Sequence, residues 1–196
     1  MCGRVVVALD SECLSEIRRF KQVRNSSKYS QSFNMAPGRF LPTYYQNKNN
    51  ENILDFMKWG TLNSNSIPLI NARSENFNLF YKNWKRCVVI ISGYYEWKKI
   101  FSKNDSEKVI DSEPYYIKSS TVDYLSVAGV YRQDGKFFYK ISDEENVVLF
   151  VTKSANKLVE HIHDRMPLII NDELTEYFYI IKELFKRRNA LWRFTN

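Results

Sequence analysis

Short runs rich in β-branched and aromatic residues recur along this chain, and they constrain its fold more than any other feature. Polar and turn-forming residues separate the runs, which is typical of strands that follow one another in a sheet. The pair Asp134 and Gly135 stands between two runs and indicates a hairpin. Most of the sheet should therefore be antiparallel. The runs are GRVVVAL (residues 3–9), LPTYYQ, ILDFMKW, RCVVIISGYYEW, PYYIKSS, YLSVAGVYR, KFFYKI and VVLFVT.

Three other segments have helical signals, and we interpret them as helices that cover the core. A helix capped by Ser11 extends to about residue 24, an aromatic face with i, i+3, i+4 and i+7 spacing spans 77–84, and a last helix begins at Asn171. The polar segment 100–113 (IFSKNDSEKVIDSE) predicts the most mobile loop. Because repeats, regular βαβ alternation and breaks in composition are all missing, we predict one α+β domain over residues 1–196. It should be a strand-rich, mostly antiparallel sheet or open barrel with a few covering helices.

Composition excludes several classes of protein. No apolar run reaches the roughly 18 to 20 residues of a membrane helix, and the amino-terminal sequence lacks the features of a secretory signal. Three cysteines without a CxxC pair argue against a disulfide framework and a thiolate zinc site. We therefore expect an intracellular, monomeric protein that is not bound to a membrane. A net charge of +7 favours an anionic partner such as nucleic acid, although basic clusters are more often solvated faces.

Four motifs contain polar residues that a fold alone would not need at those places. They are MCGR (1–4), NARSE (71–75), GYYEW (93–97) and HIHDRMP (161–167). In the first, Cys2 becomes the amino-terminal residue once Met1 is removed. It then offers two nucleophiles, an α-amine with a pKa of about 8 and a thiol with a pKa of about 8.5. The alternative is an incidental thiol at a frayed terminus.

The other motifs supply candidate acid/base and binding groups. Glu96 follows an apolar run, where desolvation would raise its pKa and suit it to proton transfer; the alternative is an ion pair with Lys98. His163 precedes Asp164 and Arg165 and is a second candidate for proton transfer, or else a structural histidine. An HxH pair could bind a metal, but no further ligands stand near it, so we predict no metal and no cofactor.

The NARSE motif provides two kinds of binding group. Asn71 has an amide that can hold an amine or a carbonyl in place. Arg73 has the forked guanidinium geometry that suits phosphate. Glu75 is expected to neutralise Arg73.

Six motifs in order and at matching spacing resemble the SOS response-associated peptidase family, and the resemblance covers nearly the whole chain. It implies a sensor of abasic sites in single-stranded DNA that shields the lesion by becoming covalently attached to it. It also implies an autoproteolytic activity and access to genomic DNA. The motifs are MCGR, FNMAPG (33–38), WG (59–60), INARSE (70–75), GYYEW (93–97) and HDRMP (163–167).

The resemblance implies a role for one residue in each of four motifs. Cys2 would be the nucleophile, and Asn71 would position the Cys2 amine and the sugar. Glu96 would be the proton shuttle, and His163 a second acid/base. The amine of Cys2 would form a Schiff base with the sugar aldehyde, and the thiol would close a five-membered thiazolidine ring. The implied DNA contacts are Arg4, Asn34 and Arg73.

Aromatic residues could explain a preference for single strands. Trp59 and Trp97, beside Pro37, could stack on exposed bases of any sequence. Burial in the core is the alternative for both tryptophans.

One departure from the family pattern is at the carboxyl end. Family members commonly continue into a closing segment with a V-S-x-x-V-N-like pattern, whereas this chain ends at ALWRFTN. We therefore expect a domain that lacks this segment.

Two other functions stay open from the sequence. Cys2 could be the nucleophile of a peptidase or amidase whose own amine is the base. The chain could also be a non-enzymatic binder of single-stranded nucleic acid in which Cys2 has no role.

Overall fold

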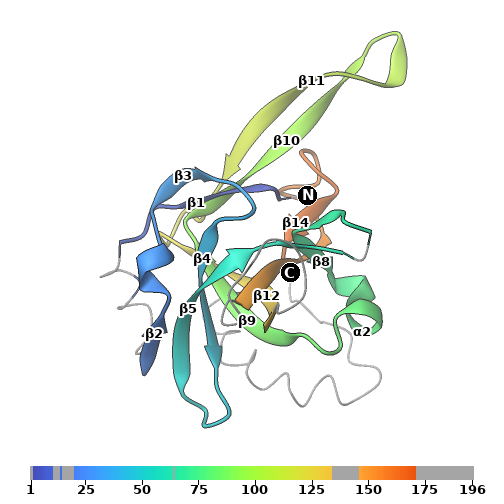
Figure 1. Cartoon of the computed structure of the whole chain (residues 1–196). Helices are drawn as coiled ribbons and strands as arrows, with labels where there is room; N and C mark the ends of the chain where they lie inside the picture. Colours follow the sequence, from blue (N-terminus) through green and yellow to red (C-terminus); the bar gives the residue numbers. More distant parts are fainter. Residues whose placement is uncertain (1, 11–13, 15–19, 64, 134–145, 171–196) are drawn as a thin grey trace.

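A computed structural model describes residues 2–10, 14, 20–63, 65–133 and 146–170 of the chain. Two sheets account for most of these residues (Figure 1). The only α-helix within the described ranges is α2, Phe77–Phe80, which follows the 3-10 turn η2, Ser74–Asn76. The prediction of a strand-rich, mostly antiparallel fold is confirmed. None of the helices in the described part is long and apolar enough to span a membrane.

The larger sheet follows an uneven ring. Its main path runs β14-β13-β12-β9-β4-β5-β2, and a short parallel pairing of β5 with β13 brings the path back on itself. β8 and β15 pair with β13 and β12 beside this path. The strands are β2 Gln22–Arg24, β4 Phe40–Gln46, β5 Asn52–Trp59, β8 Asn71–Arg73, β9 Lys85–Ile91, β12 Leu125–Gln133, β13 Asn146–Ser154, β14 Arg165–Pro167 and β15 Ile169–Ile170.

The smaller sheet holds the amino-terminal segment. Its order is β11-β10-β1-β3, and every pairing in it is antiparallel. In Figure 1 the outer part of the β10–β11 hairpin projects away from the rest of the described chain. The strands are β1 Arg4–Val7, β3 Ser32–Met35, β10 Gly93–Ser102 and β11 Asp105–Ile117; a separate ribbon pairs β6 Thr61–Leu62 with β7 Pro68–Leu69, and a 3-10 turn, η1, spans Ser26–Lys28.

The long strands of the ring are buried on both faces. Alternate residues of β9 enter two different apolar clusters, which explains why this strand is a continuous hydrophobic run. Cys87, Val89 and Ile91 belong to the first cluster, and Val88 and Ile90 belong to the second. The first cluster also includes side chains of the amino-terminal segment and of β10. The core and the amino terminus are therefore packed as one unit.

Several predictions about individual elements need correction. The segment 100–113 is not a loop, because it forms most of the paired strands β10 and β11. The predicted first helix is wrong at its end, since Gln22–Arg24 is a strand that pairs in parallel with β5. The predicted helix over 77–84 is only four residues long, although its aromatic side chains other than Phe80 do pack on the core.

Other predicted features lie partly or wholly outside the described residues. The turn at Asp134 and Gly135, the KFFYKI strand and the helix from Asn171 are among them. The strands on either side of residues 134–145, β12 and β13, pair in antiparallel fashion, with Gln133 opposite Asn146. The predicted hairpin would instead pair β12 with KFFYKI, so it stays a prediction.

Candidate active site around the amino terminus

Strand β1 carries Cys2 into the protein interior. It lies between β10 and β3, with Val5 and Val7 fully buried. Cys2, which precedes the strand, is 1% exposed, and its Sγ lies 3.8 Å from the carbonyl oxygen of Arg4. Burial, together with the charge of Glu96, raises the pKa of the Cys2 thiol well above its usual range. The thiol is therefore protonated at neutral pH.

Asn71 fixes the backbone of Cys2. It begins β8, which pairs in parallel with β13 and places Asn71 opposite Phe150. Its Nδ2 donates a hydrogen bond of 3.0 Å to the carbonyl oxygen of Cys2. The Oδ1 of the same amide is buried and has no hydrogen-bond partner among the described residues. One end of the amide thus holds Cys2, and the other end can accept a hydrogen bond from a bound group.

Glu96 comes from β10, where side chains alternate between the interior and the surface. Tyr94 and Glu96 are buried, whereas Tyr95 and Trp97 are partly exposed on the opposite face. Burial raises the pKa of the Glu96 carboxyl, and the positive charges of the amino terminus and of His163 partly oppose this effect. The carboxyl therefore lies within electrostatic reach of the chain's amino terminus and of His163. A pKa above the usual range suits a group that donates and accepts protons near neutrality.

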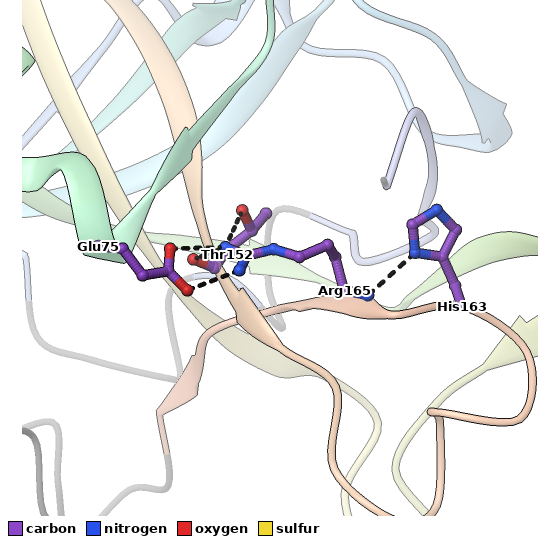
Figure 2. Close-up of polar contacts among 4 residues, drawn as sticks. All are labelled: Glu75, Thr152, His163 and Arg165. Carbon is purple, nitrogen blue, oxygen red and sulfur yellow. Dashed lines mark hydrogen bonds and ion pairs between the residues drawn. The ribbon is translucent and has the colours of Figure 1, made fainter.

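A partly buried ion pair between Arg165 and Glu75 lies next to His163 (Figure 2). Arg165 is bound by both carboxylate oxygens of Glu75, at 2.6 and 3.0 Å, and it also donates to the carbonyl oxygen of Thr152 at 2.8 Å. The backbone N–H of Arg165 donates to Nδ1 of His163 at 3.0 Å. Arg165 lowers the pKa of Glu75 through these bonds. The prediction that Glu75 neutralises Arg73 is wrong, because its partner is Arg165.

Nδ1 of His163 has two competing neighbours. When the imidazole is neutral, Nδ1 can accept the hydrogen bond from the Arg165 backbone, and Nε2 then carries the proton. When the imidazole is protonated, Nδ1 can instead donate to Asp164, whose Oδ1 lies 2.8 Å away. Both protonation states therefore have a partner in place, which suits a group that exchanges protons.

The exposed face of the smaller sheet holds several predicted DNA contacts. Nη1 of Arg4 donates to Oδ1 of Asn34 at 3.0 Å across β1 and β3. On β10 the rings of Tyr95 and Trp97 lie 6.3 Å apart, and Tyr95 also packs against Tyr116 at 5.1 Å. The sequence analysis missed Tyr95 and Tyr116, although the alternation with Glu96 could have identified Tyr95.

The remaining predicted DNA contacts have different surroundings. Pro37 and Arg73 are exposed. The prediction that Trp59 stacks on bases is wrong, because this side chain is 0% exposed. Its ring packs against Phe150 at 5.0 Å, and its Nε1 donates to the carbonyl oxygen of Ile70 at 3.1 Å. Trp59 thus supports the segment that leads into β8.

The described residues contain no cluster of three or more His, Cys, Asp or Glu side chains that could hold a metal ion. His161 lies apart from any such group, with its ring 6.4 Å from that of Tyr115.

Comparison with known proteins gives a consistent result. The family model described as "SOS response associated peptidase (SRAP)" matches residues 1–186. The abasic site processing protein YoqW of Bacillus subtilis is 29% identical over 188 residues, which cover 88% of this chain and 77% of YoqW. The abasic site processing protein HMCES of Xenopus tropicalis is 24% identical over 228 residues, which cover 88% of this chain and 64% of HMCES.

Solved structures share the same fold. A protein from Bacteroides thetaiotaomicron superposes with a TM-score of 0.69 at 18% identity, covering 90% of this chain and 80% of that protein. A phage-related protein from Bordetella bronchiseptica gives a TM-score of 0.65 at 25% identity, covering 88% of this chain and 79% of the other.

Proposed function

This chain belongs to the SOS response-associated peptidase family, and on that premise we propose that it recognises abasic sites in single-stranded DNA and attaches to them covalently through Cys2. The observation that carries the proposal is the hydrogen bond from Asn71 to the Cys2 carbonyl, which holds Cys2 within electrostatic range of the buried carboxyl of Glu96. Relatives that are named abasic site processing proteins support the choice of substrate.

The order of the chemical steps follows from the state of the two nucleophiles. Removal of Met1 leaves Cys2 with a free α-amine, whose ordinary pKa of about 8 gives a useful neutral fraction at pH 7. The buried thiol is protonated at that pH. The amine therefore attacks the sugar aldehyde first. A nitrogen–carbon bond forms, the carbonyl electrons move to oxygen, and a carbinolamine results after proton transfer.

Glu96 can serve both of the steps that follow. Its carboxyl, whose pKa is raised by burial, gives a proton to the carbinolamine hydroxyl. Water leaves, and an iminium ion forms. The resulting carboxylate then takes the proton of the Cys2 thiol while sulfur bonds to the iminium carbon and the carbon–nitrogen π electrons return to nitrogen. The product is a neutral thiazolidine, one water has been released, and Glu96 is protonated again.

His163 and Asn71 have supporting roles in this proposal. His163 acts electrostatically on Glu96 and can exchange a proton with the sugar as its ring opens. The free Oδ1 of Asn71 can accept a hydrogen bond from the Cys2 amine or from a sugar hydroxyl. Arg4, Asn34, Arg73, Pro37 and Trp97 would contact the DNA without reading its sequence.

A peptidase activity is the second candidate, because the family's description contains that word. Cys2 could attack a peptide carbonyl with the same neighbours. A thiol pKa far above its usual range works against this reaction, since the thiolate is the nucleophile that attacks an acyl group. Aldehyde chemistry is favoured because the amine can begin it. Any autoproteolytic release of the amino terminus would also use Cys2 as the nucleophile.

The test is a denaturing gel of Met1-free protein mixed with a single-stranded oligonucleotide that carries one abasic site. We expect a heat-stable adduct that is lost with Cys2→Ala and with an acetylated amino terminus. An undamaged oligonucleotide of the same sequence is the control. Absence of the adduct, or its persistence in Cys2→Ala, would overturn the proposal. Cleavage of a peptide without any reaction with abasic DNA would favour the peptidase.

A further inference from the structure

Tyr94 carries a buried hydroxyl that the fold does not use. The side chain is 0% exposed and belongs to the apolar cluster that includes Cys2. Its phenolic oxygen is buried and has no hydrogen-bond partner among the described residues. Such an atom destabilises a folded protein, and phenylalanine would fill the same space without this penalty. A hydroxyl retained at this place therefore calls for an explanation in terms of function.

The position of Tyr94 points to the reaction at Cys2. It stands two residues before Glu96 on β10, so both side chains leave the same face of the strand. On the neighbouring strand β1 it lies opposite Val5, three residues after Cys2. Gly93, the residue before Tyr94, allows β11 to lie close to β10, because a Cβ there would lie 2.7 Å from the carbonyl oxygen of Ile117.

Electrostatics keep the hydroxyl protonated. Burial raises the pKa of Tyr94 far above its usual range, and the negative charges of Cys2 and Glu96 raise it further. The titratable groups that act on Tyr94 are Cys2, in the amino-terminal segment, and Glu96, on the same strand. The other side chains of the cluster that contains Tyr94 are mostly apolar. The phenol therefore keeps its proton throughout the physiological pH range, and it lies within electrostatic range of Cys2 and Glu96.

We propose that Tyr94 is a positioning residue that donates a hydrogen bond to the Cys2 sulfur as the thiazolidine ring closes. This inference rests on the proposed function. In the closing step the thiol proton passes to the Glu96 carboxylate, and negative charge develops on sulfur before the sulfur–carbon bond is complete. Tyr94 keeps its own proton and stabilises that charge. In the resting protein the sulfur instead lies near the Arg4 carbonyl oxygen, at 3.8 Å, so it must turn to receive the hydrogen bond.

The hydrogen bond acts on one step only. Attack of the amine and loss of water place no charge on sulfur, so iminium formation does not need the hydroxyl. Ring closure does need it. A hydrogen bond to a charged group is worth enough to change a rate by roughly ten- to a hundredfold.

The experiment compares the wild-type protein with Tyr94→Phe, which removes only the hydroxyl. Both react with the abasic oligonucleotide, and samples taken over time are treated with borohydride. Borohydride reduces the iminium to an amine that is two hydrogen atoms heavier than the thiazolidine adduct, so mass spectrometry counts the two species separately. We expect the iminium to form at an unchanged rate in Tyr94→Phe and to accumulate, because its conversion to thiazolidine is at least tenfold slower.

Two further measurements separate this role from a structural one. The matched control is Tyr131→Phe, a buried tyrosine of the same cluster whose phenol pKa is also raised by burial, and it should close the ring at the wild-type rate. Thermal unfolding of Tyr94→Phe should show a melting temperature equal to or above that of the wild type. Equal ring-closure rates in wild type and Tyr94→Phe, or equal slowing in both variants, would overturn the inference. Absence of any adduct in the wild type would instead overturn the proposed function.

Discussion

The side-chain amide of Asn71 donates a hydrogen bond of 3.0 Å to the carbonyl oxygen of Cys2, which lies 69 residues earlier in the sequence. The bond connects the amino-terminal segment, held by the smaller sheet, to β8 of the larger sheet. It therefore fixes the backbone of Cys2 relative to groups that the larger sheet supports.

Asn71→Ala should slow adduct formation by roughly ten- to a hundredfold, because loss of the amide leaves a buried carbonyl unpaired and the amine unoriented. The measurement is the rate of adduct formation at saturating oligonucleotide. Asn156→Ala is a suitable control, since its amide oxygen binds backbone N–H groups in a turn elsewhere. A wild-type rate in Asn71→Ala would show that Cys2 needs no such support.

Glu96→Gln should slow adduct formation and should also stabilise the protein at neutral and alkaline pH. The folded pKa of Glu96 is raised, so the folded protein binds its proton more tightly than the unfolded chain does. Stability is then highest below the unfolded pKa and falls as pH rises toward the folded pKa. Glutamine stays neutral and avoids this loss.

Melting curves over a pH series test this prediction about Glu96. The advantage of Glu96→Gln in melting temperature should disappear in acid, with about 2–4 °C expected for each kcal/mol of difference. Glu113→Gln, an exposed carboxyl on β11, provides the control. A pH-independent difference between Glu96→Gln and wild type would contradict the raised pKa.

The strand order of the fold was only partly predictable from the sequence. The run RCVVIISGYYEW suggested one strand, yet it divides at Ser92 into β9 and β10, which belong to different sheets. Long-range hydrogen bonds make this division: Ser92 donates its N–H to Val6 and accepts from Ala8 through its hydroxyl. No local pattern marks such contacts. The outer part of the β10–β11 hairpin was predicted as a loop because charged side chains on both of its exposed faces hide the alternation that identifies strands.

The residues of the candidate site could be predicted from the sequence, but their arrangement in space could not. Cys2, Asn71 and Glu96 were recognisable because their chemistry stands out at a terminus, in a polar motif and after an apolar run. Tyr94 was not, since a tyrosine in a strand is ordinarily core. Arg165 was also missed as the partner of Glu75, because the pair joins segments 90 residues apart.

Glu75→Gln should lower the stability at neutral pH by about 1 kcal/mol, since a half-exposed carboxylate that binds a buried guanidinium is lost. Arg165 lowers the pKa of Glu75, so this contribution is present above the unfolded pKa and disappears as pH falls through the lower, folded pKa. Urea unfolding at neutral and at acid pH measures it. We also expect slower adduct formation, because Arg165 holds His163 through its backbone. An unchanged rate of adduct formation would show that the Glu75–Arg165 ion pair does not affect the candidate site.

The two tryptophans of the family motifs should respond to substitution in opposite ways. Trp59 is fully buried and Trp97 is 37% exposed on the outer face of β10. Trp59→Ala should lower the free energy of unfolding by about 3–5 kcal/mol, because it opens a cavity against Phe150 and removes the hydrogen bond to Ile70. Trp97→Ala should change stability little and weaken binding of an undamaged single strand by about 1–3 kcal/mol through lost stacking. Fluorescence anisotropy measures binding and urea titration measures stability. Full DNA affinity in Trp97→Ala would place the single strand on another face of the protein, away from Tyr95 and Arg4.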